Sequence, residues 1–355
     1  IRSNSCMKKL VLIVLLIVVV AAAFVGWRFF TDNTAFLEQS KFIYIPTKEA
    51  SYSYLLQVVR DSQLVKNPGS FDMAARRLSL DQQVKPGRYE IKKGMSIVEI
   101  VRLLRSGIQA PVNITINKVR TREGLASMFG RKYECDSADI MAWLNNPEAL
   151  KKYDLDTNTA MVLVYPNTYT YFWNSTPDDI FEKLYAEHKK VWNEERQQKA
   201  ARLGLTPVTA YILASIVEEE TNAKEEKGYV ASVYLNRLKR GMRLQADPTV
   251  KFAVRDFGLK RIYEKHYSVP SPYNTYLNTG LPPGPICTPS LETIDAVLES
   301  PETEFLYFVA KSDFSGRHDF SATFAEHRQK ANAYRKALTE QQRIRRAREK
   351  NSSQQ

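Results

Sequence analysis

Tyr211-Ile-Leu-Ala-Ser-Ile-Val-Glu-Glu-Glu-Thr-Asn222 is the stretch around which the chain is organised. Thr206 and Pro207 come just before it and are typical of a helix N-cap followed by the first helical position. Apolar residues then recur at helical spacing, which predicts a helix with one apolar face. That face is expected to carry Val208, Ile212, Leu213, Ile216 and Val217.

Three carboxylates follow the apolar residues on this helix. At ~100° of rotation per residue, Glu220 lies one turn beyond Ile216 and Val217, inside the apolar face. Glu218 is expected to point to the opposite side, toward solvent, and Glu219 to lie at the edge of the face. A carboxyl group on a buried face has a raised pKa and can act as a general acid. Alternatively, Glu220 only ends the helix, with its carboxylate in water.

Length and charge limit the classes of function. The chain has 355 residues, enough for two or three domains, and a net charge of +12. Such a charge suits nucleic acid, an anionic membrane surface or an anionic polymer. No nucleic-acid-binding motif accompanies it, so we expect no nucleic-acid partner. The spacing of the four histidines forms no ligand cluster. We therefore expect no metal and no cofactor.

The N-terminal region predicts a membrane segment. Residues 1–6 look like an extension before Met7, and residues 10–27 carry no charge, long enough to approach spanning a bilayer. Lys8 and Lys9 place the N-terminus in the cytoplasm and the remainder outside. The alternative is a cleaved signal peptide with its cleavage site among the alanines at 21–23. The length of the apolar run favours an uncleaved anchor, with residues 1–30 as cytoplasmic tip and membrane helix.

The remaining elements predict an α+β protein. Strands are expected at 41–46, 87–91, 110–117, 305–311 and 318–323. Helices are expected at 51–64, 70–80, 96–107, 121–133, 137–146, 176–195, 228–240 and 291–300, and from about 324 onward. Residues 166–169 are expected to form a turn, residues 242–286 to be irregular, and the tail after 342 to fray. Cys135 and Cys287 could pair, although we favour free thiols.

Residues 85–101, Lys85-Pro-Gly-Arg-Tyr-Glu-Ile-Lys-Lys-Gly-Met-Ser-Ile-Val-Glu-Ile-Val101, resemble part of a LysM-like module. LysM modules are strand-helix-helix-strand units that dock on glycan chains. The resemblance implies such a module over residues 38–110. The alternative is that any small α/β unit shows this pattern.

A second resemblance covers most of the chain. It is carried by Ala214-Ser-Ile-Val-Glu-Glu-Glu-Thr221, Val233-Tyr-Leu-Asn-Arg-Leu238, Arg243-Leu-Gln-Ala-Asp-Pro-Thr-Val250, Tyr273-Asn-Thr-Tyr276, Gly280-Leu-Pro-Pro-Gly284 and Leu306-Tyr-Phe-Val309. In this order the motifs resemble the YceG-like family of endolytic murein transglycosylases. The implied catalytic domain spans residues 111–345, with a basic and polar tail at 346–355. The family's usual Pro-Asp-Thr-Tyr is Pro166-Asn-Thr-Tyr169 here, and the acidic-glycine pair that often precedes it is missing.

The family resemblance implies a lytic transglycosylase, a lyase that cleaves the MurNAc–GlcNAc bond of nascent peptidoglycan strands without water. The products would carry 1,6-anhydroMurNAc ends, and strand length would be limited during wall synthesis. The family's catalytic glutamate corresponds to Glu220. The resemblance also implies a single-pass protein of the bacterial cytoplasmic (inner) membrane with its catalytic domain on the outer face. Partners are expected among the wall-synthesis enzymes, such as penicillin-binding proteins.

Loop position and the family pattern together suggest the substrate contacts. These are Gln245, Asp247, Asn274 and Tyr276, with Arg243 and Glu218 behind them. Asp247 could orient a sugar hydroxyl, serve as a second acid, or only form the turn before Pro248. Two rival functions stay open: a muramidase that uses water and two carboxylates, and a wall-binding scaffold with a dead active site.

Overall fold

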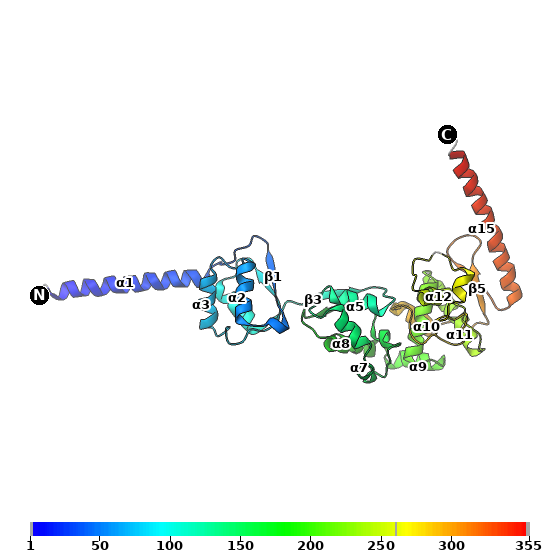
Figure 1. Cartoon of the computed structure of the whole chain (residues 1–355), viewed down its shortest axis with the longest axis horizontal. Helices are drawn as coiled ribbons and strands as arrows, with labels where there is room; N and C mark the ends of the chain where they lie inside the picture. Colours follow the sequence, from blue (N-terminus) through cyan, green and yellow to red (C-terminus); the bar gives the residue numbers. More distant parts are fainter. Residues whose placement is uncertain (1–2, 260, 353–355) are drawn as a thin grey trace. The chain divides into compact units, whose positions relative to one another are not determined.

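The computed structural model describes residues 3–259 and 261–352. The chain divides into two compact units, and each is described by itself (Figure 1). Unit 1 comprises Ile1–Asn113, Lys132–Cys135 and Thr170–Thr176, and unit 2 comprises Ile114–Arg131, Asp136–Tyr169 and Pro177–Gln355. Helices and short antiparallel sheets are mixed in the chain, which confirms the α+β prediction. The predicted domain boundaries stay a prediction.

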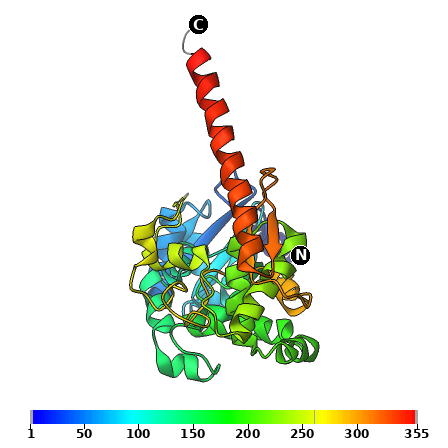
Figure 2. The same ribbon diagram turned by 90° about the vertical axis from the view of Figure 1, so that its right-hand side faces the viewer.

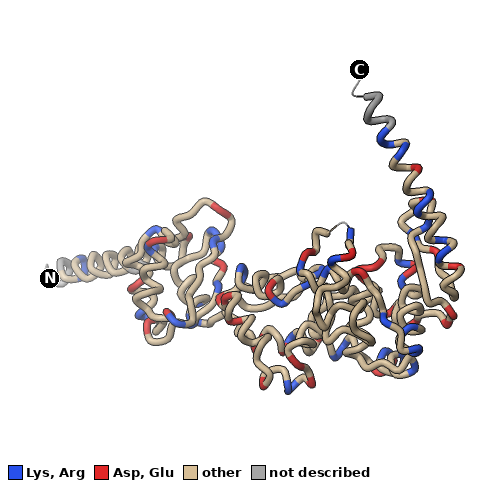
Figure 3. Tube along the Cα trace, turned by 45° about the vertical axis from the view of Figure 1, so that its right-hand side comes forward, with Lys and Arg blue, Asp and Glu red and all other residues tan. Residues whose placement is uncertain are grey.

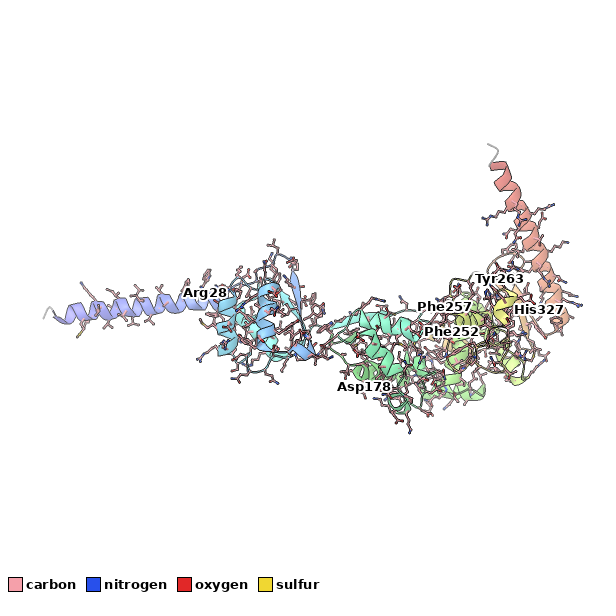
Figure 4. The ribbon with its side chains drawn as sticks, viewed as in Figure 1. Arg28, Asp178, Phe252, Phe257, Tyr263 and His327 are labelled. Atoms are coloured by element: carbon pink, nitrogen blue, oxygen red, sulfur yellow. The ribbon has the colours of Figure 1, made fainter. Side chains whose placement is uncertain are left out.

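Unit 1 begins with the apolar helix α1 (Ser3–Phe30). Its segment Met7–Phe30 has a mean hydropathy of 3.1 and is long and apolar enough to cross a bilayer. At the end of α1, Arg28 Nε donates a hydrogen bond to Ser70 Oγ at 2.7 Å, which ties the helix to the rest of the unit (Figure 4). An N-terminal membrane anchor is consistent with this helix, whereas its orientation stays a prediction.

The rest of unit 1 is a two-stranded antiparallel sheet with helices packed against it. Strands β1 (Ser40–Ile45) and β2 (Gly87–Lys92) pair antiparallel, with Ile43 opposite Tyr89. Between and after them come η1 (Thr47–Glu49), α2 (Tyr52–Asp61), α3 (Pro68–Arg77) and α4 (Ile97–Ser106). The predicted capping box Ser96–Glu99 is present, and Gly107 ends α4 at a φ of 76°. The order of strand, two helices, strand and helix agrees with the elements expected for residues 41–107, whereas the LysM-like module and its docking on glycan stay predictions.

Helix α10 (Pro207–Glu220) lies at the centre of unit 2. Thr206 caps it and Pro207 begins it, as predicted. All residues from Ala210 to Val217 are buried, because α10 packs against α11 (Lys227–Lys239), α12 (Asp247–Val254) and α14 (Leu291–Leu298). The prediction of a single apolar face was therefore too narrow: this is a core helix surrounded by protein.

Further elements complete unit 2 around this core. They are α5 (Arg122–Gly130), α6 (Ser137–Leu144), α7 (Pro147–Lys151), η2 (Ala160–Leu163), α8 (Pro177–Val191), α9 (Glu194–Arg202), η3 (Lys224–Glu226) and α13 (Glu264–Tyr267). Strand β3 (Val112–Ile116) pairs with β4 (Asn167–Tyr171), and residues 114–116 and 167–169 are the parts of the two strands that belong to this unit. Strands β5 (Tyr307–Ala310) and β6 (His318–Ser321) form an antiparallel pair. The start of α15 (Phe324–Ser352) packs on this pair (Figure 2).

Four predictions of local structure were wrong. The expected turn at 166–169 is largely β4, whose Tyr169 and Tyr171 alternate inward as in a half-buried strand. The long helix at 176–195 breaks because Asn193 caps a new helix, α9, with its side chain accepting from Arg196 N at 2.9 Å. The irregular region 242–286 contains α12 and α13. Helix α15 continues to Ser352, where fraying was expected.

Thiols and charges add two further observations. Cys135 and Cys287 are both buried thiols, the state that the sequence analysis favoured. Within residues 3–259 and 261–352, no group of three or more His, Cys, Asp or Glu side chains could hold a metal ion. Basic residues occur in both units, interspersed with acidic ones, and recur along α15 (Figure 3).

Candidate active site

A cleft of about 320 Å³ opens in unit 2 at the C-terminal end of α10. Four of the predicted site residues line it: Glu220, Gln245, Asp247 and Tyr276. They come from the end of α10, the segment before α12, the first turn of α12 and the loop after α13. The fold thus gathers on one cleft residues that are up to 56 positions apart in sequence.

Glu220 is the last residue of α10 and accepts a hydrogen bond from Tyr234 Oη to Oε1 at 2.5 Å. Burial raises the pKa of Glu220 from 4.5 to about 7. The Tyr234 hydrogen bond opposes this rise in pKa, the negative charge of Asp247 adds to it, and the positive charges of Lys251 and Arg237 oppose it. The carbonyl end of a helix also disfavours a negative charge. A carboxyl group with this pKa can donate or accept a proton near neutral pH.

Asp247 is held by two tyrosines. Its Oδ1 accepts hydrogen bonds from Tyr276 Oη at 2.7 Å and from Tyr267 Oη at 3.3 Å. The two rings lie against each other, with centroids 4.2 Å apart. Burial and the charge of Asp247 raise the pKa of Tyr276, so its hydroxyl stays protonated and donates. The carboxylate therefore has a fixed orientation at the start of α12, in the same cleft as Glu220.

Gln245 reaches the cleft through an unusual backbone conformation. Its φ is 49°, in the left-handed region that residues other than glycine seldom adopt. Its backbone N donates to Thr275 O at 3.1 Å, and both neighbours, Leu244 and Ala246, are fully buried. The side chain of Gln245 is exposed between these two anchors. Backbone strain of this kind is concentrated at functional sites.

The structure does not bring Asn274 or Arg243 to the cleft lining. Asn274 is fully buried, and its Nδ2 donates to Tyr267 O and Val269 O at 2.9 Å each. Its Oδ1 accepts from Tyr276 N at 3.0 Å, so the amide holds the loop instead of facing a ligand. Arg243 is exposed outside the lining. Asn274, which was expected to contact the substrate, is engaged within its loop, and Arg243, which was expected behind the other residues, lies outside the cleft lining; their contacts with substrate stay predictions.

Glu218 does not face solvent as predicted, because its side chain is only 14% exposed. Its Oε2 accepts hydrogen bonds from Lys227 Nζ at 3.0 Å, from Ser290 Oγ at 3.1 Å and from Thr293. Burial raises the pKa of this carboxyl, but the bonds from Thr293 and Lys227 and the charges of Lys227 and Lys118 lower it overall.

Glu219 is also bound to cations. Arg120 Nε and Nη2 donate to its two carboxylate oxygens at 3.1 and 3.0 Å, and Lys118 lies 3.4 Å away. Glu218 and Glu219 are thus neutralised by lysine and arginine, whereas Glu220 is bonded to the neutral hydroxyl of Tyr234. The pKa values of Glu218 and Glu220 shift in opposite directions because their partners differ.

The remaining cleft residues were not predicted as site residues. Tyr234 and Arg237 lie three positions apart on α11, so they share a helix face, and both belong to a quoted motif. Arg237 Nε donates to Leu306 O and its Nη1 to Leu244 O, both at 2.7 Å. Tyr307 comes from β5, and Phe324 and His327 come from α15; Figure 4 labels His327. Tyr307 belongs to the quoted motif Leu306-Tyr-Phe-Val309, whereas no sequence signal pointed to Phe324 or His327.

Comparison with known proteins identifies relatives of the chain. The model of the YceG-like family matches residues 43–333. The endolytic murein transglycosylase of Bacillus subtilis (strain 168) is 29% identical over 303 residues, covering 80% of this chain and 82% of that protein. The endolytic murein transglycosylase of Streptococcus pneumoniae serotype 2 is 26% identical over 257 residues, covering 64% of this chain and 46% of that protein.

A solved structure points to the same family. The crystal structure of a YceG-like protein from Listeria monocytogenes superposes with a TM-score of 0.53 at 26% identity. The match covers 82% of this chain and 98% of that one. Because the family model spans most of the sequence, the chain belongs to the YceG-like family.

Proposed function

We propose that this protein is an endolytic lytic transglycosylase that cleaves the MurNAc–GlcNAc bond of peptidoglycan glycan strands. One observation carries the proposal: the carboxyl of Glu220 lines the cleft, and its pKa is about 7. The names of its relatives in Bacillus and Streptococcus support it. Cleavage within nascent strands would limit their length during wall synthesis.

In the proposed reaction Glu220 acts as both acid and base. Because Oε1 accepts the hydrogen bond from Tyr234, the proton of the neutral acid resides on Oε2. This proton passes to the glycosidic oxygen as the bond to C1 of MurNAc breaks, and the N-acetyl group of the sugar stabilises the developing positive charge. The C6 hydroxyl then attacks C1 and returns its proton to Glu220, which leaves a 1,6-anhydro end. The Tyr234 hydroxyl stabilises the carboxylate between the two steps.

Substrate contacts are proposed for the other polar groups of the cleft. The amide of Gln245 suits hydroxyl and acetamido groups, and the ring of Tyr276 offers a stacking face. Asp247, held by Tyr276, would orient a sugar hydroxyl. Glu218 and Asn274 would support the site through structure, by holding the end of α10 and the loop before Tyr276. Arg243 stays a proposed contact for a longer substrate only.

Location and partners follow from the proposed activity. Helix α1 would anchor the protein in the cytoplasmic membrane with the part of the chain after Phe30 on the outer face, where peptidoglycan is assembled. The LysM-like module at 38–110 would dock on glycan strands, and the catalytic domain at 111–345 would cleave them. Enzymes that polymerise the strands, such as penicillin-binding proteins, would be partners at this site.

The test is mass spectrometry of products after the full chain in detergent is incubated with uncrosslinked glycan strands. Glu220→Gln removes the titrating proton. Glu182→Gln, the same change at an exposed residue of α8, is the control. Anhydro-ended fragments that disappear with Glu220→Gln but not with Glu182→Gln support the proposal.

Other outcomes identify the rival functions. Products with reducing ends, if Asp247→Asn abolishes them as Glu220→Gln does, would mean a hydrolase in which Asp247 activates water. Asp247 could take this role because it lines the same cleft as Glu220. Binding of strands without any cleavage would mean a wall-binding scaffold.

A further inference from the structure

The wall of the cleft formed by β5 and α15 is aromatic. Phe324 is 61% exposed although it lines the cleft. Its ring centroid lies 5.8 Å from that of Tyr307 and 6.2 Å from that of His327. His327 stacks on Tyr307 with centroids 5.3 Å apart and planes at 24°. Three rings from two elements therefore pack together at one side of the cleft.

His327 carries an unused polar atom in this wall. Its Nδ1 is buried and has no hydrogen-bond partner among the residues that the structure describes. Burial and the charges of Arg237 and Arg335 lower the pKa of His327, so the ring is neutral at pH 7. A neutral imidazole has one N–H and one lone pair.

The buried nitrogen fixes the tautomer. A proton on Nδ1 would be an orphaned buried N–H, which is rarer in proteins than an unused acceptor. The proton therefore belongs on Nε2. Because Nδ1 is sealed from solvent, Nε2 is also the one polar side-chain atom of His327 that can reach the cleft. His327 thus offers a single donor, set against aromatic rings, to whatever occupies this side of the cleft.

We propose that Phe324 and His327 form a sugar subsite, in which the Phe324 ring stacks on a pyranose and His327 Nε2–H donates to an oxygen of the same sugar. The proposal rests on the proposed function. A pyranose has an apolar face of C–H groups and a rim of oxygens, and this wall presents an apolar ring next to one donor. The subsite lies in the same cleft as Glu220, so it would hold one sugar of the strand that is being cleaved.

Tyr307 and Arg237 would hold this subsite in place and would not form hydrogen bonds with the sugar. The Arg237 guanidinium lies 5.3 Å from the centre of the Tyr307 ring, on which His327 stacks. Since Arg237 also binds the carbonyls of Leu306 and Leu244, the wall is tied to the segment that carries Gln245. The subsite is therefore preformed.

Binding to the inactive full chain tests the proposal. The ligand is a preparation of uncrosslinked glycan strands with the peptide stems removed, and its Kd is measured by calorimetry for the Glu220→Gln protein in detergent. Added substitutions are His327→Gln, whose amide nitrogen lies near the position of Nε2, and His327→Asn, whose amide nitrogen lies near that of Nδ1. Phe324→Ala removes the stacking ring. Ile344→Ala, at an exposed apolar residue further along α15, is the matched control.

We expect His327→Gln to keep the Kd within about twofold, and His327→Asn to weaken binding about tenfold, the effect of one lost hydrogen bond. Phe324→Ala should weaken it by a similar factor, and Ile344→Ala should leave it unchanged. Equal Kd values for all variants would overturn the subsite. The subsite would also be overturned if His327→Gln and His327→Asn weakened binding equally and both lowered the Tm, because that pattern would mean a structural role for His327.

The proposed function and the subsite fail in different ways. If the Glu220→Gln protein does not bind strands and the unmutated protein does not cleave them, the proposed function is wrong. If the Glu220→Gln protein binds strands and the wall variants bind equally well, only the subsite is wrong.

Discussion

Replacing the proposed catalytic acid should stabilise the protein, and the gain should depend on pH. In Glu220→Gln the carboxyl is exchanged for an amide of the same shape, and the amide oxygen can still accept the hydrogen bond from Tyr234. What disappears is the cost of ionising a buried carboxyl at the end of α10. In the unmutated protein this cost lowers the free energy of unfolding as the pH rises, and it is largest above neutral pH, because burial raises the pKa of Glu220 to about 7.

The magnitude follows from linkage. An unfolded chain would return the pKa to its ordinary value of 4.5, so the folded state binds more protons than the unfolded one between pH 4.5 and about 7. Stability is therefore lost as the pH rises through this window, and the loss is complete above it. At about 1.4 kcal/mol per pKa unit, the difference between the two values corresponds to about 3 kcal/mol. Glutamine does not titrate, so the variant escapes this loss.

The assay is chemical unfolding of the full chain in detergent at several pH values between 5 and 8. Local stability is read from hydrogen exchange of peptides in α10, which report on unit 2. The free energy of unfolding of Glu220→Gln minus that of the unmutated chain should rise with pH by about 3 kcal/mol. Glu182→Gln, on the exposed face of α8, should give a difference that does not rise in this window. A flat difference for Glu220→Gln would refute the assignment of a raised pKa to this carboxyl.

Three further variants test the groups around Glu220. Tyr234→Phe removes a bond that stabilises the carboxylate, so the alkaline limb of the pH–rate profile should move up by about one unit; an unchanged limb would separate Tyr234 from catalysis. Gln245→Gly relieves the left-handed backbone and should raise stability by about 1 kcal/mol while the rate of cleavage falls; a fall in stability would remove the argument from strain. Lys227→Met leaves Glu218, which is only 14% exposed, with Lys118 at 3.8 Å as its one remaining cation among the described residues, and should lower the free energy of unfolding by about 3 kcal/mol; a much smaller loss would mean that Lys118 or water replaces Lys227.

Local signals predicted the start and position of α10 well. The Thr206 cap and Pro207 are local features, and the 3.6-residue repeat placed Glu220 toward the protein interior. The same wheel failed for Glu218, because it assumed that the side opposite the apolar face meets water. In the fold that side meets Thr293 and Lys227, which come from other helices. A helical wheel gives directions around one helix and cannot show what lies in each direction.

Residue chemistry predicted some of the cleft, but it could not tell which polar groups were already occupied. Gln245 and Asn274 both carry amides that suit sugars, and both lie in segments expected to be irregular. In the structure the amide of Asn274 forms hydrogen bonds with two backbone carbonyls and one backbone N–H. These backbone groups need a side-chain partner because an irregular loop has no helix or sheet hydrogen bonds. Gln245 stays available because its own loop is held by backbone bonds and buried neighbours.

The cations at the end of α10 explain why one of three consecutive glutamates can exchange a proton near neutral pH. A buried carboxylate is stable as an anion only where a cation and hydrogen bonds replace water. Lys227 serves Glu218, and Arg120 with Lys118 serves Glu219, so these cations are engaged away from the cleft. Glu220 instead accepts a hydrogen bond from a phenol at the negative end of a helix and lies near an aspartate, and the charges of Lys251 and Arg237 only partly oppose the rise in its pKa. The ion pairs behind the cleft therefore keep Lys227, Lys118 and Arg120 bound to the other two glutamates instead of to Glu220.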